Sequence, residues 1–450
     1  MRWLCCTFFC ICIILPTLAN DKTERAIELT DEQALSVSDI MINAGDIGAA
    51  TDLLNDILQS DNVNIRTGAL FNLGRIAITQ GDYNTAKRYF LTILKWNPEY
   101  TRVRVELARC YILADEYANA DFQLRLVLGD KNLPPAIAEQ VRKMLNYVRQ
   151  NKGWAISAGL AIVPDSNLNY VSGQKQECVN TWFGPMCRNL QEKEQGIGIK
   201  YNLGGEYFLR LNSRFSIRNS LSLHALDFKT SKYDDYSLYI ASGPRYISQS
   251  WEASIQAFTM LHWYGGKYYN TAPGARVDIN IDLTNRLNFA FGGAYTRTRY
   301  KDSLADSLWR NNEYTAYIQP MYYLNNKSFV FFGLEYFDSN TVVFAYGNNG
   351  FGYSLGYYVE LPWTLNLYTK LDMRHTIYNE EQYFINSNHE LERYTRHDNT
   401  YSAYVRIGTR LFETRNIYPA ISYTFSLTDS NVPMYEYHKH RIQIEANYRF

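Results

Sequence analysis

Long apolar segments are absent from this sequence beyond its first 20 residues. The mean hydropathy of the 450-residue chain is -0.33. A membrane-spanning helix needs about 20 consecutive apolar residues, so the sequence excludes a helical membrane protein. Acidic and basic residues number 45 each, and the resulting net charge of +0 gives no reason to expect nucleic acid as a partner.

Catalytic motifs are also missing. The sequence contains neither a His-Glu-x-x-His zinc helix nor a Gly-x-Ser-x-Gly nucleophile elbow. His438 and His440 would share one face of a strand, but no third ligand accompanies them, so we expect no metal and no other cofactor. His224 and His262 leave a lipid-cleaving enzyme open as an alternative, although no serine near them has a recognisable base and orienting group.

Four of the seven cysteines lie within residues 1–19, and the rest of the chain is poor in them. Residues 1–19 have the pattern of a signal peptide, with Arg2 before an apolar run and small residues up to Ala19. The apolar run is short for a membrane anchor, which is the alternative. We therefore expect an exported protein whose first 19 residues are removed.

The three later cysteines have different surroundings. Cys178 and Cys187 lie nine positions apart in one polar loop, and an exported protein can form disulfides. We expect a bridge between them that holds this loop. Cys110 lies in a helical pattern and is expected to be packed rather than reactive.

From about Gly153 onward, apolar and polar residues alternate. In the last ten residues, even-numbered positions are apolar and odd-numbered positions are polar or charged. This alternation is typical of a strand with one apolar and one polar face. An even number of such strands is typical of a bacterial outer-membrane β-barrel. We expect 14 strands, near residues 154–168, 196–211, 214–228, 235–247, 251–264, 267–281, 285–300, 311–323, 327–338, 351–361, 364–378, 398–411, 417–428 and 438–450.

The connections between these strands differ in length. Every second connection is short, and bacterial barrels have short periplasmic turns and longer outer loops. An even strand number places both ends of the barrel on the periplasmic side, so the residues before the barrel are expected in the periplasm and the long loops at the cell surface. The longer polar loops are expected near 170–195, 301–310, 339–350, 379–397 and 429–437.

The alternation also assigns the faces of the strands. An arginine or lysine at the midplane of the lipid face costs about 2–4 kcal/mol, so charged residues should face a polar lumen and apolar residues the outer-membrane lipid. A soluble β-sandwich is the alternative, but it would have to bury these strands against each other. The expected lumen residues are Lys200, Glu206, Arg210, Arg218, Arg245, Arg276, Asp278, Glu335, Lys370, Asp372, Arg374, Arg406, Arg410, Arg441, Glu445 and Arg449.

Residues 28–150 have helical periodicity and an internal repeat of about 34 residues. One copy contains Leu70, Leu73, Gly74, Ala77, Gly81, Tyr83, Ala86, Phe90 and Pro98. The next contains Leu107, Ala108, Tyr111, Tyr117, Ala120 and Leu124. Both resemble the tetratricopeptide repeat, and a helical bundle with chance spacing is the alternative. The expected domains are a signal peptide at 1–19, helical repeats at 28–150 and a barrel at 153–450.

Tetratricopeptide stacks present a concave face formed by the first helix of each pair. On the pattern of that family, three arginines would converge on this face and favour an acidic or carboxylate-ended peptide. A solvated helical face remains the alternative. The expected client-binding groove comprises Asn72, Arg75, Arg102, Glu106 and Arg109.

The end of the chain resembles the C-terminal signal that the barrel-assembly machinery recognises. Tyr448 and Phe450 would supply its aromatic residues, although Glu445 stands near the place where such signals often have a glycine. We therefore expect the barrel-assembly machinery as a partner.

The ordered combination of these features resembles the Slam family, the surface lipoprotein assembly modulators, which includes related host-colonisation factors. The resemblance rests on Leu73, Gly74, Ala86, Phe90, Pro98, the segment Pro164 to Asn169, and Phe450. It implies an α-helical repeat domain followed by a transmembrane barrel, and a non-enzymatic protein that delivers surface lipoproteins or related secreted proteins across the outer membrane. A diffusion porin, or a host-interaction outer-membrane protein with a periplasmic protein-binding domain, is the alternative.

Overall fold

The computed structural model describes residues 29–386 and 388–449. The expected signal peptide and Phe450 lie outside the described residues. The chain forms two compact units, and the boundary between them lies between Arg66 and Thr67. Among the described residues, no helix is both long enough and apolar enough to cross a membrane.

The first unit is helical, and local signals set the ends of its helices. Thr30 and Gln33 form a capping box at the start of its first helix. Gly45 ends that helix with a φ of 84°, a left-handed conformation that favours glycine. The elements are α1 (Asp31–Ala44), α2 (Ile47–Asp56), the 3-10 turn η1 (Ile57–Gln59) and the beginning of α3 (Val63–Thr79).

The second unit begins with the rest of α3 and four further helices. Close pairing of α3 with the next helix requires a glycine, because a Cβ at Gly74 would lie 2.6 Å from Cε1 of Phe90. Pro135 begins the last of these helices, where its missing N–H costs nothing. The helices are α4 (Tyr83–Trp96), α5 (Thr101–Leu113), α6 (Tyr117–Leu128) and α7 (Pro135–Asn151).

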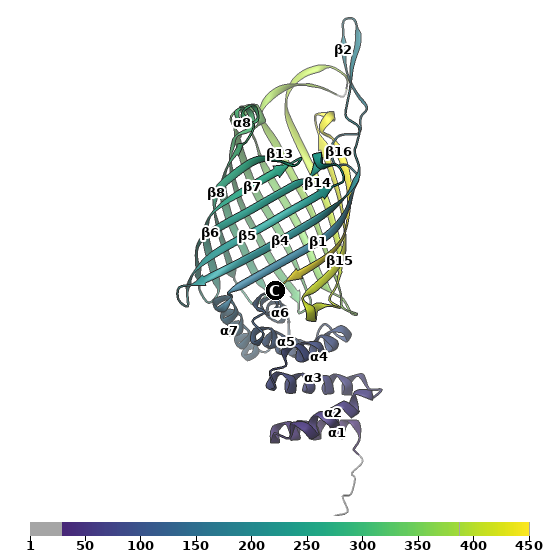
Figure 1. Cartoon of the computed structure of the whole chain (residues 1–450), viewed down its shortest axis with the longest axis vertical. Helices are drawn as coiled ribbons and strands as arrows, with labels where there is room; N and C mark the ends of the chain where they lie inside the picture. Colours follow the sequence, from purple (N-terminus) through teal and green to yellow (C-terminus); the bar gives the residue numbers. More distant parts are fainter. Residues whose placement is uncertain (1–28, 387, 450) are drawn as a thin grey trace, which may run out of the picture. The chain divides into compact units, whose positions relative to one another are not determined.

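A closed antiparallel barrel of 14 strands follows, as the sequence predicted. The first strand closes the ring against the last, with Ala161 opposite Glu445 and Ser157 opposite Arg449. Figure 1 shows the strands tilted across the barrel wall. The strands are β1 (Trp154–Asp165), β4 (Gly196–Arg210), β5 (Phe215–Phe228), β6 (Asp235–Ile247), β7 (Trp251–Tyr264), β8 (Lys267–Asp282), β9 (Leu287–Tyr300), β10 (Asn311–Asn325), β11 (Ser328–Thr341), β12 (Asn348–Glu360), β13 (Leu365–Ile385), β14 (Leu391–Thr409), β15 (Ile417–Ser430) and β16 (Tyr437–Arg449).

The two ends of the barrel differ. At one end, here called the turn end, short connections join the strands at 211–214, 248–250, 283–286, 326–327, 361–364 and 410–416. Helices α6 and α7 lie at this end in Figure 1. The opposite end, here called the loop end, carries most of the longer connections, although β7 and β8 are joined there by residues 265–266 alone. It also carries the short helix α8 (Ser303–Trp309) and the separate hairpin of β2 (Gln176–Thr181) and β3 (Gly184–Asn189).

The outer face of the barrel wall is apolar and exposed. Leu203 and Ile444 are 53% and 55% exposed, respectively. Lys200 and Glu206 alternate with the apolar residues of β4 and are half-buried on the other face. An exposed apolar band of this kind is the expected lipid contact of an outer-membrane barrel, with the polar face in the lumen.

Two segments that the sequence assigned to loops contain strands instead. The region 170–195 forms the β2–β3 hairpin, and residues expected at 379–397 extend β13 and β14. These extensions lack an apolar alternation, because strands that continue past the lipid need no apolar face. A shift of register between Ile377 and Glu381 marks the change.

We predict that Leu203→Arg weakens the barrel, because this side chain lies on the lipid face near the middle of β4. The cost should be about 2–4 kcal/mol. Ser222→Arg is the control, since Ser222 lines a cavity on the lumen side. Heat-dependent gel mobility in mild detergent measures the difference, and equal loss in the two variants would contradict this assignment of faces.

Candidate functional site: the covered mouth of the barrel

Helix α6 lies across the mouth of the lumen at the turn end. Its Asn119, Phe122 and Gln123 line a cavity of about 460 Å³ together with Arg406 and Tyr418 of the barrel. Ala118 lines a second cavity, of about 440 Å³, on the β4–β7 side of the lumen. The opposite side of α6 is buried in the helical stack, where Leu124 is fully buried. One helix therefore belongs to both the repeat stack and the wall of the lumen.

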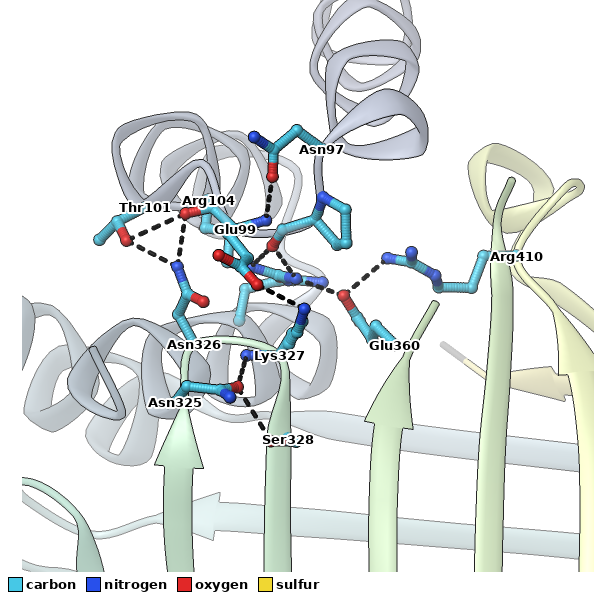
Figure 2. Close-up of polar contacts among 12 residues, drawn as sticks. Asn97, Glu99, Thr101, Arg104, Asn325, Asn326, Lys327, Ser328, Glu360 and Arg410 are labelled. Atoms are coloured by element: carbon cyan, nitrogen blue, oxygen red, sulfur yellow. Dashed lines mark hydrogen bonds and ion pairs between the residues drawn. The ribbon is translucent and has the colours of Figure 1, made fainter. Parts of the chain in front are cut away.

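A buried arginine connects the helices to the barrel. Arg104 of α5 has no exposed side-chain surface and forms an ion pair with Glu360, the last residue of β12. It also donates from Nη1 to Oε1 of Gln123 at 2.7 Å and from Nε to the carbonyl of Pro98 at 3.0 Å. Figure 2 shows Arg104 and Glu360 pointing toward each other between the helices and the strand ends.

Glu360 has a second cationic partner from the barrel. Arg410, in the turn after β14, approaches Oε2 of Glu360 to 3.0 Å. The Glu360 side chain is 0% exposed and that of Arg410 is 6% exposed. Removal of one member of a buried ion pair is costly, because the remaining charge loses its partner without regaining water. This triad therefore fixes α5 relative to two turns of the barrel.

A second group of polar contacts lies at the turn between β14 and β15. Tyr111 of α5 donates to Oε1 of Glu413 at 3.0 Å, and Asn119 of α6 donates to Oδ1 of Asn416 at 3.2 Å. Burial raises the pKa of the Glu413 carboxyl above its ordinary value of 4.5, and Arg410 opposes this rise. A carboxylate in such a place destabilises the docked arrangement unless it takes up a proton.

Further contacts extend along the rim. Asp282, at the end of β8, forms ion pairs with Arg125 of α6, at 2.9 Å, and with Arg149 of α7. Asn326, in the turn after β10, donates to the carbonyl of Glu99 at 2.6 Å. A Cβ at Gly129 would collide with the backbone of Asn325. The helices thus meet the turn end mainly through charged and hydrogen-bonded groups.

The expected groove residues fall into two groups. Arg102 and Arg109 are exposed on α5, where Arg102 lies over the ring of Phe71 at 4.7 Å and Arg109 pairs with Glu106 at 3.7 Å. Arg75 is half-buried on α3, and Asn72 is only 5% exposed. The contact between Arg102 and the ring of Phe71 places the exposed faces of α3 and α5 next to each other.

The expected lumen residues also separate into two groups. Three lie at the turn end: Arg210 donates to Asn151, Arg245 pairs with Glu252, and Arg410 pairs with Glu360. The second group lies along the inner wall, where Lys200 is half-buried and the other side chains form ion pairs. These pairs are Glu206 with Arg218, Arg276 with Asp278, Glu335 with Arg374, Lys370 with Asp372, Arg406 with Glu445, and Arg441 with Asp165, and Glu206 also pairs with Lys152 after α7.

Sequence reasoning missed Arg104 and Glu360. A signal was present, because Arg104 lies three and four positions before Leu107 and Ala108 and therefore on the apolar face of α5. A charged residue at a core position needs a partner. Glu360 gave no comparable signal, since a polar residue at the end of a strand is ordinary.

The disulfide of the β2–β3 hairpin lies at the loop end, away from this mouth, whereas Cys110 is buried in α5. Cys178 and Cys187 are joined by a disulfide in the β2–β3 hairpin, and burial raises the pKa of the Cys110 thiol to about 12. No group of three His, Cys, Asp or Glu side chains in the described part of the chain could hold a metal ion. The rings of His438 and His440 lie 5.9 Å apart on an exposed face.

The two remaining histidine candidates lie on either side of Ser237, which the strand register sets opposite both of them. Nδ1 of His224 lies 2.8 Å from Oδ1 of Asn202, and Nε2 of His262 lies 3.0 Å from Oδ1 of Asp235. A nucleophile would need such a histidine as its base. Among the described residues, the hydrogen bonds of these two histidines go to Asn202 and Asp235 and not to Ser237.

A family model of the surface lipoprotein assembly modifier matches residues 154–450. The chain belongs to this family. A tetratricopeptide repeat model matches residues 77–139. Both family resemblances that the sequence suggested are therefore confirmed.

Relatives in the surface lipoprotein assembly modifier family are distant but match over most of their length. The protein of this name from Pasteurella multocida is 24% identical over 405 residues, which are 83% of this chain and 75% of the relative. Surface lipoprotein assembly modifier 1 of Haemophilus influenzae is 22% identical over 461 residues, or 97% and 90% of the two chains. Among solved structures, the outer membrane channel DcaP of Acinetobacter baumannii matches 67% of this chain and 98% of its own, with 9% identity and a TM-score of 0.37.

We predict that Glu360→Leu weakens the attachment of the helices by about 3–5 kcal/mol, because it leaves Arg104 buried without its carboxylate. Arg104→Met should cost less, since Glu360 keeps Arg410. The double variant should recover part of the loss. Protease sensitivity of α6 and α7 with an intact barrel measures the attachment.

The control for this series is Arg109→Gln, which removes an exposed pair on the same helix and should change the attachment by less than about 1 kcal/mol. Additive losses in the double variant would contradict a direct interaction between Arg104 and Glu360.

We predict that the attachment of the helices weakens as the pH rises above the ordinary carboxyl pKa of 4.5. The raised pKa of Glu413 means that its contribution is fully present below the ordinary carboxyl value of 4.5 and is lost as the pH passes its higher folded value. Glu413→Gln should keep the hydrogen bond from Tyr111 and flatten this dependence. Proteolysis of α6 measured at increasing pH tests it; an unchanged slope in Glu413→Gln would show that another group is responsible.

Proposed function

We propose that this protein delivers surface lipoproteins, or related secreted proteins, across the outer membrane to the cell surface. The names of its relatives support this class of client. The observation that carries the proposal is the position of α6 across the mouth of a polar lumen, with Gln123 facing a cavity and Leu124 buried in the stack. A repeat domain in this place can pass a bound chain directly to the pore.

The proposed orientation places the turn end and the helices in the periplasm and the loop end at the cell surface. Short turns on the periplasmic side and longer loops outside are usual for bacterial barrels. Tyr448 lies near the end of β16 at the turn end, where the barrel-assembly machinery would bind it together with Phe450. In this proposal the outer-membrane lipid surrounds the apolar band.

The client-binding groove would be the exposed face shared by α3 and α5. Arg102 and Arg109 supply two exposed guanidinium groups there, and Arg75 lies on the neighbouring helix. Guanidinium groups bind carboxylates through paired hydrogen bonds. An acidic or carboxylate-ended segment of the client is therefore the proposed ligand of this groove.

Transfer would require α6 to leave the mouth. The cavities beside it measure about 460 and 440 Å³. A folded domain is far too large for them, because even one of 100 residues has a radius of gyration of about 13 Å. We therefore propose that the client passes as an unfolded chain. Charged contacts at a domain interface can be exchanged for water, and folding of the client outside the cell would supply the energy.

A diffusion porin is the second candidate, because charged pairs such as Arg406 and Glu445 line the lumen wall. Purified protein in liposomes separates the two functions. Free passage of small solutes, with no client lipoprotein appearing on the far side, would favour the porin. The position of α6 favours restricted passage until the helices move.

We predict that Arg75→Gln, Arg102→Gln and Arg109→Gln together weaken client capture and lower the surface display of lipoproteins several-fold. A strain without this protein, complemented with each variant, provides the test, and protease shaving measures the lipoproteins exposed on intact cells. The barrel should remain assembled, because these residues lie outside it.

A matched control replaces Arg88, Lys131 and Lys143 by glutamine, which removes three exposed cations elsewhere in the repeat domain. Display should then stay normal. Normal display with the first set of changes would remove the groove assignment, and normal display in the strain without the protein would remove the proposed function itself.

A further inference from the structure

Two arginines project from the outer face of the barrel at the loop end of β9. Tyr295 lies on this outer face, 38% exposed, and the alternation of the strand places Arg297 and Arg299 on the same side. Both arginines are exposed. The register sets Arg297 beside Asn312 of β10 and Arg299 beside Thr271 of β8, so both arginines lie among neutral residues of the wall.

Neither guanidinium has a carboxylate partner among the residues that the structure describes. The two acidic side chains of the following loop, Asp302 and Asp306, already have partners. Asp302 caps α8 through the N–H of Ala305, and Asp306 pairs with Arg310 at 3.5 Å. The two positive charges on the wall are therefore not neutralised from within the protein.

Neighbouring aromatic residues locate these charges relative to the bilayer. The rings of Tyr295 and Tyr314 lie 5.2 Å apart on the outer face, and the hydroxyl of Tyr295 donates to Asn312 at 2.9 Å. Aromatic girdles of this kind mark the edge of the hydrocarbon layer. On a tilted strand, each outward-facing residue lies about 5 Å farther along the membrane normal than the outward-facing residue before it. Arg297 and Arg299, which follow Tyr295 on this face, therefore reach into the headgroup layer.

We propose that Arg297 and Arg299 form a binding site for the phosphorylated headgroup of a lipid in the leaflet at the loop end. A charge at the membrane interface costs about 0–1 kcal/mol, and it becomes favourable when a phosphate neutralises it. Arginine binds phosphate through paired hydrogen bonds, and two guanidinium groups on adjacent outward positions can hold one phosphate between them. Lys301, which is exposed two positions later, adds a third positive charge.

This site does not depend on the proposed client function, but the choice of lipid A as its ligand rests on the proposed orientation, in which the loop end lies at the cell surface. It would fix the height and tilt of the barrel at β8–β10. A fixed height and tilt of the barrel in the membrane would keep the loop end at the level of the membrane surface while the helices move at the other end.

The test uses the full chain in a neutral detergent and purified diphosphorylated lipid A as the probe, with binding measured by native mass spectrometry. Arg297→Gln with Arg299→Gln should weaken binding by about tenfold or more. Arg297→Lys with Arg299→Lys should weaken binding less, because lysine keeps the positive charge. Dephosphorylated lipid A should bind the unaltered protein about tenfold more weakly.

Arg393→Gln is the matched control, because Arg393 is an exposed arginine of β14 at the same end that already pairs with Glu381 at 3.6 Å. It should bind the probe normally. Equal binding by the double variant and the unaltered protein would overturn the proposal, and so would an equal loss in Arg393→Gln. Complete displacement of the lipid by millimolar inorganic phosphate would show a site for a free anion and overturn the assignment to lipid.

If the double variant fails to assemble, as judged by heat-dependent gel mobility, the single variants take its place. Each should then bind the probe a few-fold more weakly than the unaltered protein. Unchanged binding in both single variants would overturn the proposal.

Discussion

The ion pair between Arg104 and Glu360 is the interaction on which the arrangement of this molecule depends. It joins a helix of the repeat stack to the end of a barrel strand in a place that water does not reach. A buried charge pair is weak evidence for net stability, but we expect it to select one geometry, because displacement of the helix leaves Arg104 without its carboxylate. Arg410 and Gln123 extend the same network to the next turn and to α6.

This polar attachment has a functional consequence. An interface made of apolar side chains would hold the helices permanently, whereas ion pairs and hydrogen bonds can be replaced by water or by a client. Glu413 makes the attachment sensitive to protonation, since its carboxyl is buried between Tyr111 and Arg410. The covered mouth is therefore a closed state from which release is physically accessible. The polar pairs farther up the lumen, such as Arg406 with Glu445, would then line the path.

The strand pattern was predictable because lipid and lumen impose opposite requirements on alternate residues. All 14 predicted strands are present, and most of their ends fall within a few residues of the predicted positions. The prediction failed where those requirements stop. The β2–β3 hairpin and the ends of β13 and β14 stand outside the apolar band, so their sequences carry no alternation. The family resemblance did not depend on this alternation, because it rested on short motifs in the repeats, at the end of the first strand and at the last residue.

The site was less predictable than the fold. The sequence pattern placed Arg410 and Arg245 in the lumen, but both lie at the rim, where contacts with the helices fix them. Such contacts join residues more than 90 positions apart, for example Arg245 and the carbonyl of Arg149. Periodicity within one element contains no information on such pairs. Arg104 was visible as an anomaly on an apolar helix face, but its partner was not.

A covalent link between α6 and the barrel tests the central claim most directly. Asn119→Cys with Asn416→Cys would place two thiols where a hydrogen bond of 3.2 Å now joins the side chains. Cells carrying this double variant, oxidised or treated with a short thiol crosslinker, should lose surface display of the client, while each single variant and the reduced double variant should retain it. Normal display with the link fully formed would contradict a transfer that requires α6 to leave the mouth.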